Sequence, residues 1–255
     1  MSLLDDQGIA TVTIDGAKSM NIIGSPEILA LTDTLARLRD EPALRVLVLR
    51  GRDDRAFIGG ADIAEMAALA PPTAEAFITR LKDLCEAVRH FPVPVIARLA
   101  GWCLGGGLEV AMACDLRLAS QSARFAETYA KIGLLPGGGG AWFLPHLVGK
   151  AWALELLLAA DFIDADTALR IGLVNHIYPD EQLLSQARAL AHRMAHMPPL
   201  SVRLIKREVN HALNGDMAAS FDLISSHIAI AKGGPDHAEA ISAFRERREG
   251  KYQGY

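Results

Sequence analysis

The stretch GWCLGGGLEVAMACDLRLAS, residues 101–120, decides the fold class. Its three consecutive glycines allow close backbone approach, and the first N–H groups of a helix have no intrahelical partners. Glu109 lies three residues after Gly106, on the same face of such a helix one turn later. The stretch therefore predicts a short helix whose first amides and carboxylate face one site.

The segment AFIGGADIAEM, residues 56–66, also combines glycines with a following helix start. Backbone amides at Ala61 and Gly106 could therefore point at one shared anionic oxygen. Loss of one donor from such an oxyanion hole typically removes about 3–4 kcal/mol of transition-state stabilisation. The helix N-terminus lowers the pKa of a base at Glu109 and apolar neighbours raise it, and the sequence leaves the balance open.

The glycine segments also have other interpretations. Glycine clusters often serve only the tight packing of a helix on a strand, and a buried Glu109 could be a paired structural charge. Neither segment fits the G-x-G-x-x-G pattern of dinucleotide-binding folds, and residues 136–140 lack the G-K-[ST] end of a phosphate loop. The residues alone leave packing and catalysis open.

Hydrophobic periodicity predicts alternating strands and helices in the first half. Ser25 and Pro26 are typical of an N-cap and a first helical residue, and Phe77 and Leu81 lie on one face of a second helix at 73–89. Strands are predicted at residues 9–14, 45–50, 95–99, 115–119 and 123–127. This order predicts a right-handed βαβ core.

The second half is mostly helical by the same criterion. Helices are predicted at residues 151–159, 164–171, 181–196, 201–213, 217–231 and 236–248, with one extended piece at 173–178. The sequence contains no linker, low-complexity run or internal repeat. We expect residues 1–195 to form the α/β core and residues 196–255 a helical C-terminal region that is not an independent domain.

Composition and charge limit the class of partner. The 255 residues carry a net charge of −4 with scattered Lys and Arg, whereas nucleic-acid binding needs a basic face. The apolar stretch 99–118 contains two acidic residues, which a membrane helix tolerates badly, and the N-terminus has no basic region typical of a signal peptide. We expect a cytoplasmic protein with three buried, reduced cysteines, Cys85, Cys103 and Cys114.

The two glycine segments resemble, in order and spacing, the two signature stretches of the crotonase family of enoyl-CoA hydratases and isomerases. Three further blocks resemble the family: KSMNII from residue 18, RFAETYAKIGLLPGGGGAW at 124–142 and AISAFRERREGKY at 240–252. The similarity thus runs along nearly the whole chain. It implies an α/β fold, a crotonase (ClpP-like) spiral of ββα units with a helical C-terminal region, and assembly as a homotrimer or homohexamer.

The resemblance also implies roles for individual residues. Ala61 and Gly106 match the two oxyanion-hole amides, and Glu109 matches the first of the two glutamates of the hydratases. Contacts with the CoA of an acyl-CoA thioester are implied for Lys18, Ser19, Met20, Gly59, Asp62, Ile63, Ala64, Phe244 and Lys251. For Phe244 and Lys251, a core aromatic and a solvated lysine are equally open interpretations. No metal and no separate cofactor are implied, since CoA arrives as part of the substrate.

The second glutamate of the hydratases falls at Tyr129 in this sequence. Hydration is expected to need two acid/base groups: one carboxylate activates water, and the other transfers the proton at the α carbon. A phenol with an ordinary pKa near 10 is a poor base at neutral pH, but it can donate a proton or orient water. Glu127 would face the same side of an extended segment and could replace the missing carboxylate, or it could have a surface or structural role.

The histidines offer no comparable constellation. His192 and His196 have the i, i+4 spacing that metals can use, but no glutamate accompanies them as in H-E-x-x-H. A position on a helix surface is the favoured interpretation, and we expect no metal site.

We therefore predict an enzyme that stabilises a thioester enolate, an enoyl-CoA hydratase-like lyase that adds water to a 2-enoyl-CoA. An isomerase, decarboxylase or C–C hydrolase acting on another acyl-CoA is an alternative within the family. A non-catalytic subunit that binds CoA thioesters is an alternative of a different class, which Tyr129 favours and Glu109 opposes. The sequence does not identify the acyl group.

Overall fold

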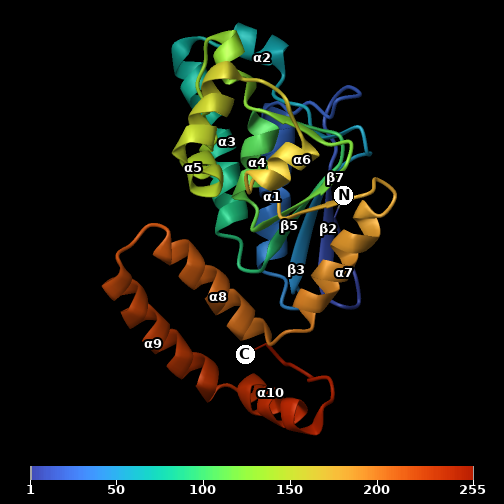
Figure 1. Cartoon of the computed structure of the whole chain (residues 1–255), viewed down its shortest axis with the longest axis vertical. Coiled ribbons are helices and arrows are strands. Elements are labelled where there is room, and N and C mark those ends of the chain that lie inside the picture. Colours follow the sequence, from blue (N-terminus) through green and yellow to red (C-terminus); the bar gives the residue numbers. More distant parts are fainter. Residues whose placement is uncertain (1, 255) are drawn as a thin grey trace.

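The computed structural model describes residues 2–254, and its centre is a pair of sheets built from ββα units (Figure 1). Successive units place one strand in each sheet. The large sheet has the order β1 (Ser2–Leu4), β2 (Ile9–Ile14), β3 (Val46–Gly51), β5 (Val95–Leu99), β7 (Leu116–Ser120) and β10 (His176–Tyr178). The small sheet has the order β4 (Ala56–Ile58), β6 (Trp102–Leu104), β8 (Arg124–Ala126) and β9 (Ile163–Asp164). Pairings from β2 to β10 in the large sheet are parallel, as the predicted βαβ core requires.

Helices cover both faces of the large sheet because its strands are apolar on both sides. The helices of the core are α1 (Ser25–Arg39), α2 (Ile63–Ala68), α3 (Pro71–Arg89), α4 (Gly106–Ala113), α5 (Gly140–Ala159), α6 (Ala165–Arg170) and α7 (Leu183–Ala195), with a 3₁₀ helix, η1, at Thr128–Ile132. One face packs on α1, α3 and α4, which contribute Leu35, Phe77 and Leu108 to the main core. The other face packs on α7 through Leu183 and Ala187.

Several boundaries differ from the sequence predictions. Ser25 is the first residue of α1 and Gly24 is its N-cap, so the predicted N-cap role of Ser25 is wrong by one residue. The helix predicted at 151–159 is the second part of α5, which is interrupted at Gly149, where φ is 77°. The helix start predicted after the glycines of residues 56–66 is the beginning of α2, a helix of six residues that buries no side chain.

The C-terminal helices form an arm that extends away from the core (Figure 1). The arm consists of α8 (Pro199–Ala212), α9 (Met217–Gly233) and α10 (Pro235–Glu246), and the predicted boundary at residue 195 lies at the end of α7. A partly buried ion pair fixes α8 to the core, because Lys206 Nζ donates to Asp115 Oδ2 at 2.7 Å and to the Val93 carbonyl at 3.0 Å. Throughout the described part of the chain, no helix combines the length and apolar character needed to cross a bilayer.

Candidate active site

The first turn of α4 lies at the end of β6, as the glycine run predicts. Gly105 has φ of 50°, in the left-handed region that favours glycine, and its N–H donates to the Ala126 carbonyl on β8 at 2.9 Å. Gly107 is equally constrained, since a β carbon there would collide with Ile58 on β4. The glycines thus press α4 against the small sheet and leave the Gly106 amide without a partner in the first turn of the helix.

The Ala61 amide faces the same region from the loop after β4. Ile23 forms an isolated parallel bridge with Ala61, in which Ile23 N–H donates to the Gly60 carbonyl and Asp62 N–H donates to the Ile23 carbonyl. This pairing uses the groups on either side of Ala61 and leaves its own N–H free. Among residues 2–254, neither the Ala61 nor the Gly106 amide donates to a protein acceptor. Two unpaired amides from neighbouring segments are suited to one carbonyl oxygen that gains negative charge.

Glu109 is completely buried and both of its carboxylate oxygens accept hydrogen bonds. Tyr129 Oη donates to Oε2 at 2.6 Å, and the Gly140 amide at the start of α5 donates to Oε1 at 2.7 Å. The glycine run before α5 is needed for this approach, because a β carbon at Gly138 would lie 2.9 Å from Oε2. The carboxylate is therefore held in one orientation by groups from η1 and α5.

Of the two opposing effects on the pKa of Glu109, the helix N-terminus and the apolar surroundings, burial in the apolar surroundings is the larger. Burial raises the pKa of Glu109 above its usual value, although the Tyr129 hydroxyl and the amides of Gly140, Gly138 and Gly139 oppose this shift. Burial and the charge of Glu109 together raise the pKa of Tyr129 further above its ordinary value. Tyr129 is therefore a proton donor beside a carboxylate that can act as a base near neutral pH.

Tyr129 also lies against the amide donor. A β carbon at Gly106 would lie 3.4 Å from Tyr129 Oη and 3.2 Å from a methyl group of Leu81 on α3. Glu109, Tyr129 and Gly106 thus lie together. Ala61 belongs to the adjoining loop, which follows β4 and pairs with Ile23, two residues before the start of α1.

Glu127 does not share a face with Tyr129 in the way an extended segment would allow. Strand β8 ends at Ala126 and η1 begins at Thr128, so the two-residue alternation stops between Glu127 and Tyr129. Glu127 is nevertheless fully buried, so a surface role is wrong.

The two segments predicted to contact CoA near the N-terminus lie side by side. Gly59 N–H donates to the Met20 carbonyl at 2.9 Å, and Lys18 Nζ lies 3.7 Å from Asp62 Oδ2. Asp62 caps α2 through hydrogen bonds from the amides of Ala64 and Glu65, which lower its pKa. Ser19 belongs to the same turn as Lys18, and Ile63 begins α2 with its side chain exposed.

Phe244 and Lys251 are not part of this assembly within one chain. Figure 1 shows α10 at the opposite end of the molecule from α2, and the chain ends between α10 and the core. Phe244 is 83% exposed, so its interpretation as a core aromatic is wrong. Lys251 is exposed as well, and its amide donates to Glu239 at 2.9 Å.

Sequence reasoning missed two supporting groups. Asn21 is buried, accepts from the Gly16 amide at 2.6 Å and donates to the Phe57 carbonyl, so it fixes the turn around Lys18 to β4. Gly140 donates to Glu109, and its signal was the run PGGGG at 136–140, which lies in a block that resembles the family but does not by itself indicate a donor to Glu109. Neither residue is of a type that suggests chemistry by itself.

Two free amides, a buried carboxylate and a phenol define an α/β enzyme that polarises a carbonyl group and moves a proton beside it. Comparison with known proteins gives the family. A family model described as enoyl-CoA hydratase/isomerase matches residues 5–255. The chain belongs to the enoyl-CoA hydratase/isomerase family, as its motifs predicted.

Individual relatives cover nearly the whole chain. A crotonyl-CoA hydratase of Syntrophomonas wolfei is 34% identical over 247 residues, which are 97% of this chain and 95% of the relative. An (E)-benzylidenesuccinyl-CoA hydratase of Thauera aromatica is 35% identical over 250 residues, 96% of each chain. The crystal structure of an enoyl-CoA hydratase from Bacillus anthracis superposes with a TM-score of 0.94 at 29% identity, covering 97% of this chain and 96% of that one. The predicted fold class, a crotonase spiral with a helical C-terminal region, is confirmed.

Proposed function

We propose that this protein is an enoyl-CoA hydratase-like lyase that adds water reversibly to the double bond of a 2-enoyl-CoA. The observation that carries the proposal is the meeting of Glu109, Tyr129 and the unpaired Gly106 amide in one buried place. Relatives that act as hydratases on crotonyl-CoA and on a larger aryl-substituted acyl-CoA support the reaction class.

In the proposed mechanism, the thioester oxygen accepts hydrogen bonds from the Ala61 and Gly106 amides. Glu109 takes a proton from water while the water oxygen bonds to carbon 3, and the electron pair of the double bond moves toward the thioester oxygen. The amides stabilise the resulting enolate. Carbon 2 then takes the proton from Glu109, which restores the carboxylate and leaves a 3-hydroxyacyl-CoA.

Tyr129 holds the base rather than replacing a second carboxylate in this mechanism. Its hydroxyl donates to Glu109 at 2.6 Å and keeps one oxygen of the carboxylate occupied. The other oxygen accepts from Gly140 and keeps a lone pair free for a proton. Isomerisation of the double bond needs only such a single shuttling carboxylate, so it is the second candidate reaction.

The test is the loss of crotonyl-CoA absorbance with wild type and with Glu109→Gln, followed by a mass-spectrometric panel of acyl-CoA substrates. We expect hydration by the wild type that Glu109→Gln reduces by about 10²–10⁴-fold. Equal rates for the two proteins would overturn the role of Glu109. Equal affinity for a CoA thioester and its free acid, measured by calorimetry, would overturn the CoA assignment.

The CoA portion is proposed to lie along the turn at Lys18–Met20 and the strip Gly59–Ala64, which the Lys18–Asp62 ion pair joins. No further cofactor is proposed, since proton transfer and enolate stabilisation need only these groups. The cytoplasm is the proposed compartment, and the three cysteines support it because all are buried and none forms a disulfide.

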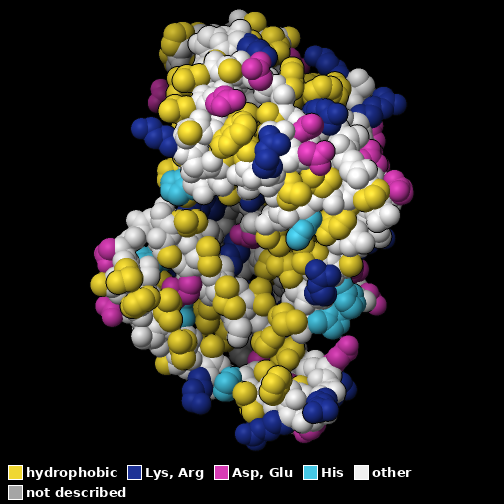
Figure 2. Space-filling view, viewed as in Figure 1, with side chains coloured by type: hydrophobic (Ala, Val, Ile, Leu, Met, Phe, Trp, Pro, Cys, Tyr) yellow, Lys and Arg dark blue, Asp and Glu magenta, His cyan; other side chains and the backbone are white. Residues whose placement is uncertain are grey.

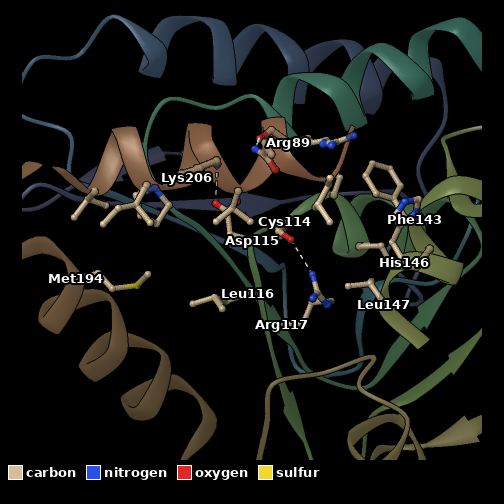
Figure 3. Close-up of a pocket in the computed structure, with 18 of the residues that line it drawn as sticks. Arg89, Cys114, Asp115, Leu116, Arg117, Phe143, His146, Leu147, Met194 and Lys206 are labelled. Atoms are coloured by element: carbon tan, nitrogen blue, oxygen red, sulfur yellow. Dashed lines mark hydrogen bonds and ion pairs between the residues drawn. The ribbon is translucent and has the colours of Figure 1, made fainter. Parts of the chain in front are cut away.

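We also propose a homotrimer or homohexamer, since the arm leaves much apolar surface uncovered. Apolar side chains that are about half exposed or more include Ile205, Val209, Met217, Phe221, Ile228 and Ile230. The surface is hollowed where the core meets α8 (Figure 2), and an apolar groove of about 460 Å³ lies there (Figure 3). Its walls include Trp142, Leu147, Met194 and Val209. A second copy would bury this surface, and monomers rarely expose so much of it.

Such an assembly would also bring Phe244 and Lys251 to the CoA of a neighbouring copy, because one chain holds them far from Gly59–Ala64. Light scattering at micromolar concentration should give a trimer or hexamer, and Val209→Asp should shift it toward the monomer. Thr79→Asp places the same charge on the exposed face of α3 and serves as the control. A monomeric wild type would refute the assembly.

A further inference from the structure

Glu127 is the one buried carboxyl next to the site whose oxygens both lack a protein partner within residues 2–254. Its exposure is 0%, whereas Glu109, equally buried, is held by Tyr129 and Gly140. An ionised carboxylate without partners in an apolar interior is strongly destabilised, and such a group keeps its proton instead. The proposed mechanism makes no use of this acid.

The backbone fixes where Glu127 lies. Strands β6 and β8 pair in parallel, with Cys103 opposite Phe125 and Leu104 opposite Ala126. The Gly105 amide continues this pairing with its bond to the Ala126 carbonyl. Glu127 therefore follows alongside Gly105, the residue that directly precedes the oxyanion donor Gly106.

The titratable groups around Glu127 supply no positive charge. Burial raises its pKa well above the usual value, and the charge of Glu109 on α4 raises it further. Tyr129 on η1, Cys103 on β6 and Cys85 on α3 also feel its charge. Arg117, which acts on Cys103, is not among the groups that shift the pKa of Glu127, and it donates to the carbonyls of Leu173 and Cys114. The charged groups on β9 and α6, which pack on β8, are exposed: Asp164, Asp166 and Arg170.

We propose that Glu127 stays protonated beside the oxyanion hole and supports the reaction as a neutral acid. Uncharged, it leaves Glu109 the only carboxylate anion of the site and lets negative charge gather on the thioester oxygen at Gly106. Ionised, it places a second negative charge next to that oxygen. The inference rests on the proposed function, because it assigns the enolate charge to this hole.

The sign of the pH effect follows from where charge develops. The bound thioester is neutral and its oxygen becomes negative only as the enolate forms, so ionisation of Glu127 lowers kcat and leaves KM nearly unchanged. Above the pKa of Glu127, kcat of the wild type should fall by up to tenfold per pH unit. The ratio of kcat for Glu127→Gln to kcat for the wild type should rise by the same factor.

The experiment is a pH profile of kcat and KM for wild type, Glu127→Gln and Tyr129→Phe, with the acyl-CoA that the substrate panel identifies. We expect the alkaline decline to disappear in Glu127→Gln and to persist in Tyr129→Phe. Its loss in Tyr129→Phe instead would assign the decline to the phenol and overturn the proposal. A decline that is unchanged in Glu127→Gln would overturn it as well.

A second measurement needs no turnover and so separates this inference from the proposed function. The pKa of Glu127 is higher in the folded state than in the unfolded state, where it is about 4.3. The free energy of unfolding of the wild type therefore falls as the pH rises from the unfolded-state pKa toward the folded-state pKa. Urea unfolding should show the unfolding constant of the wild type, relative to Glu127→Gln, rising by up to tenfold per pH unit in that window. Glu127→Met provides the comparison if the glutamine variant does not fold, and a ratio independent of pH would refute a neutral Glu127.

Discussion

The interior around Glu109 and the C-terminal arm differ in how many of their contacts come from the same chain. The Glu109 carboxylate is fully buried and bound at both oxygens by Tyr129 and Gly140. The arm, α8–α10, buries few of its side chains and leaves large apolar residues such as Phe221 and Ile228 exposed. The chain therefore completes its proton-transfer site alone, whereas its arm presents a surface that another molecule must cover.

Variants at the Glu109 site and variants in the arm should therefore have different effects. Changes at the Glu109 site should alter turnover without altering assembly, because every group that orients the carboxylate comes from the same chain. Changes in the arm should alter assembly and stability first. Four variants test this separation, in decreasing order of expected effect.

The largest effect is expected from Ala61→Pro, which deletes the amide donor while keeping a small side chain. Turnover of a CoA thioester should fall by about 10²–10³-fold, since one oxyanion donor is lost. The measurement is kcat with circular dichroism and light scattering on the same sample. Retained turnover in a folded protein would remove Ala61 from the oxyanion hole, and altered assembly would break the separation.

Lys206→Met should reduce stability by about 3 kcal/mol, because it leaves Asp115 largely buried without its cation. Urea unfolding at fixed protein concentration measures the change. The double variant Lys206→Met/Asp115→Asn is the control and should recover part of the loss. A change below about 0.5 kcal/mol would mean that this ion pair does not hold α8 to the core.

Tyr129→Phe removes a hydrogen bond to a charged acceptor, worth about 2 kcal/mol, and should lower kcat by about 30-fold. Hydration of short 2-enoyl-CoA by the wild type should itself be weak, because a second positioned carboxylate contributes about 10²–10⁴-fold. Tyr129→Glu should therefore raise the hydration rate.

Two outcomes would contradict the expectation that wild-type hydration is weak. Robust wild-type hydration that survives Glu127→Gln would show that one glutamate is enough. Robust hydration that is lost in Glu127→Gln would show that Glu127 fills the second catalytic role.

The smallest effect is expected from Gly138→Ala, whose β carbon would lie 2.9 Å from Glu109 Oε2 and 3.0 Å from Leu81. The displaced carboxylate should lower kcat by about tenfold, equivalent to about 1.4 kcal/mol. Gly233→Ala is the matched control, because its added carbon meets no atom within 4 Å. Equal kcat for both variants would show that the carboxylate tolerates displacement.

Long amphipathic helices and apolar strands could be predicted from the sequence, whereas some of the short elements could not. Periodicity predicted α3, in which Phe77, Leu81 and Leu84 are buried. Strands β4 and β6 are three residues long and depend on neighbours that are distant in sequence. Helix α2 buries nothing, so the glycines before it indicated its start but no apolar stripe indicated its length.

In the candidate site, too, contacts between residues that are distant in sequence could not be predicted. The motifs placed Glu109 and Tyr129 together because each lies in a matched segment. The hydrogen bond between them and the donor at Gly140 depend on a fold that joins residues 109, 129 and 140. The burial of Glu127 was equally invisible, since its environment is set by β6 and α4 rather than by its neighbours in sequence.

The most direct test of the central claim, that this chain stabilises a thioester enolate with Glu109 as the base, is deuterium exchange at the α carbon of butyryl-CoA in D₂O. This saturated thioester cannot be hydrated, so the measurement isolates proton transfer from water addition. We predict that mass spectrometry shows deuterium incorporation with the wild type, and incorporation at least about 100-fold slower with Glu109→Gln. Absence of incorporation by the wild type, or equal incorporation by both proteins, would contradict the claim.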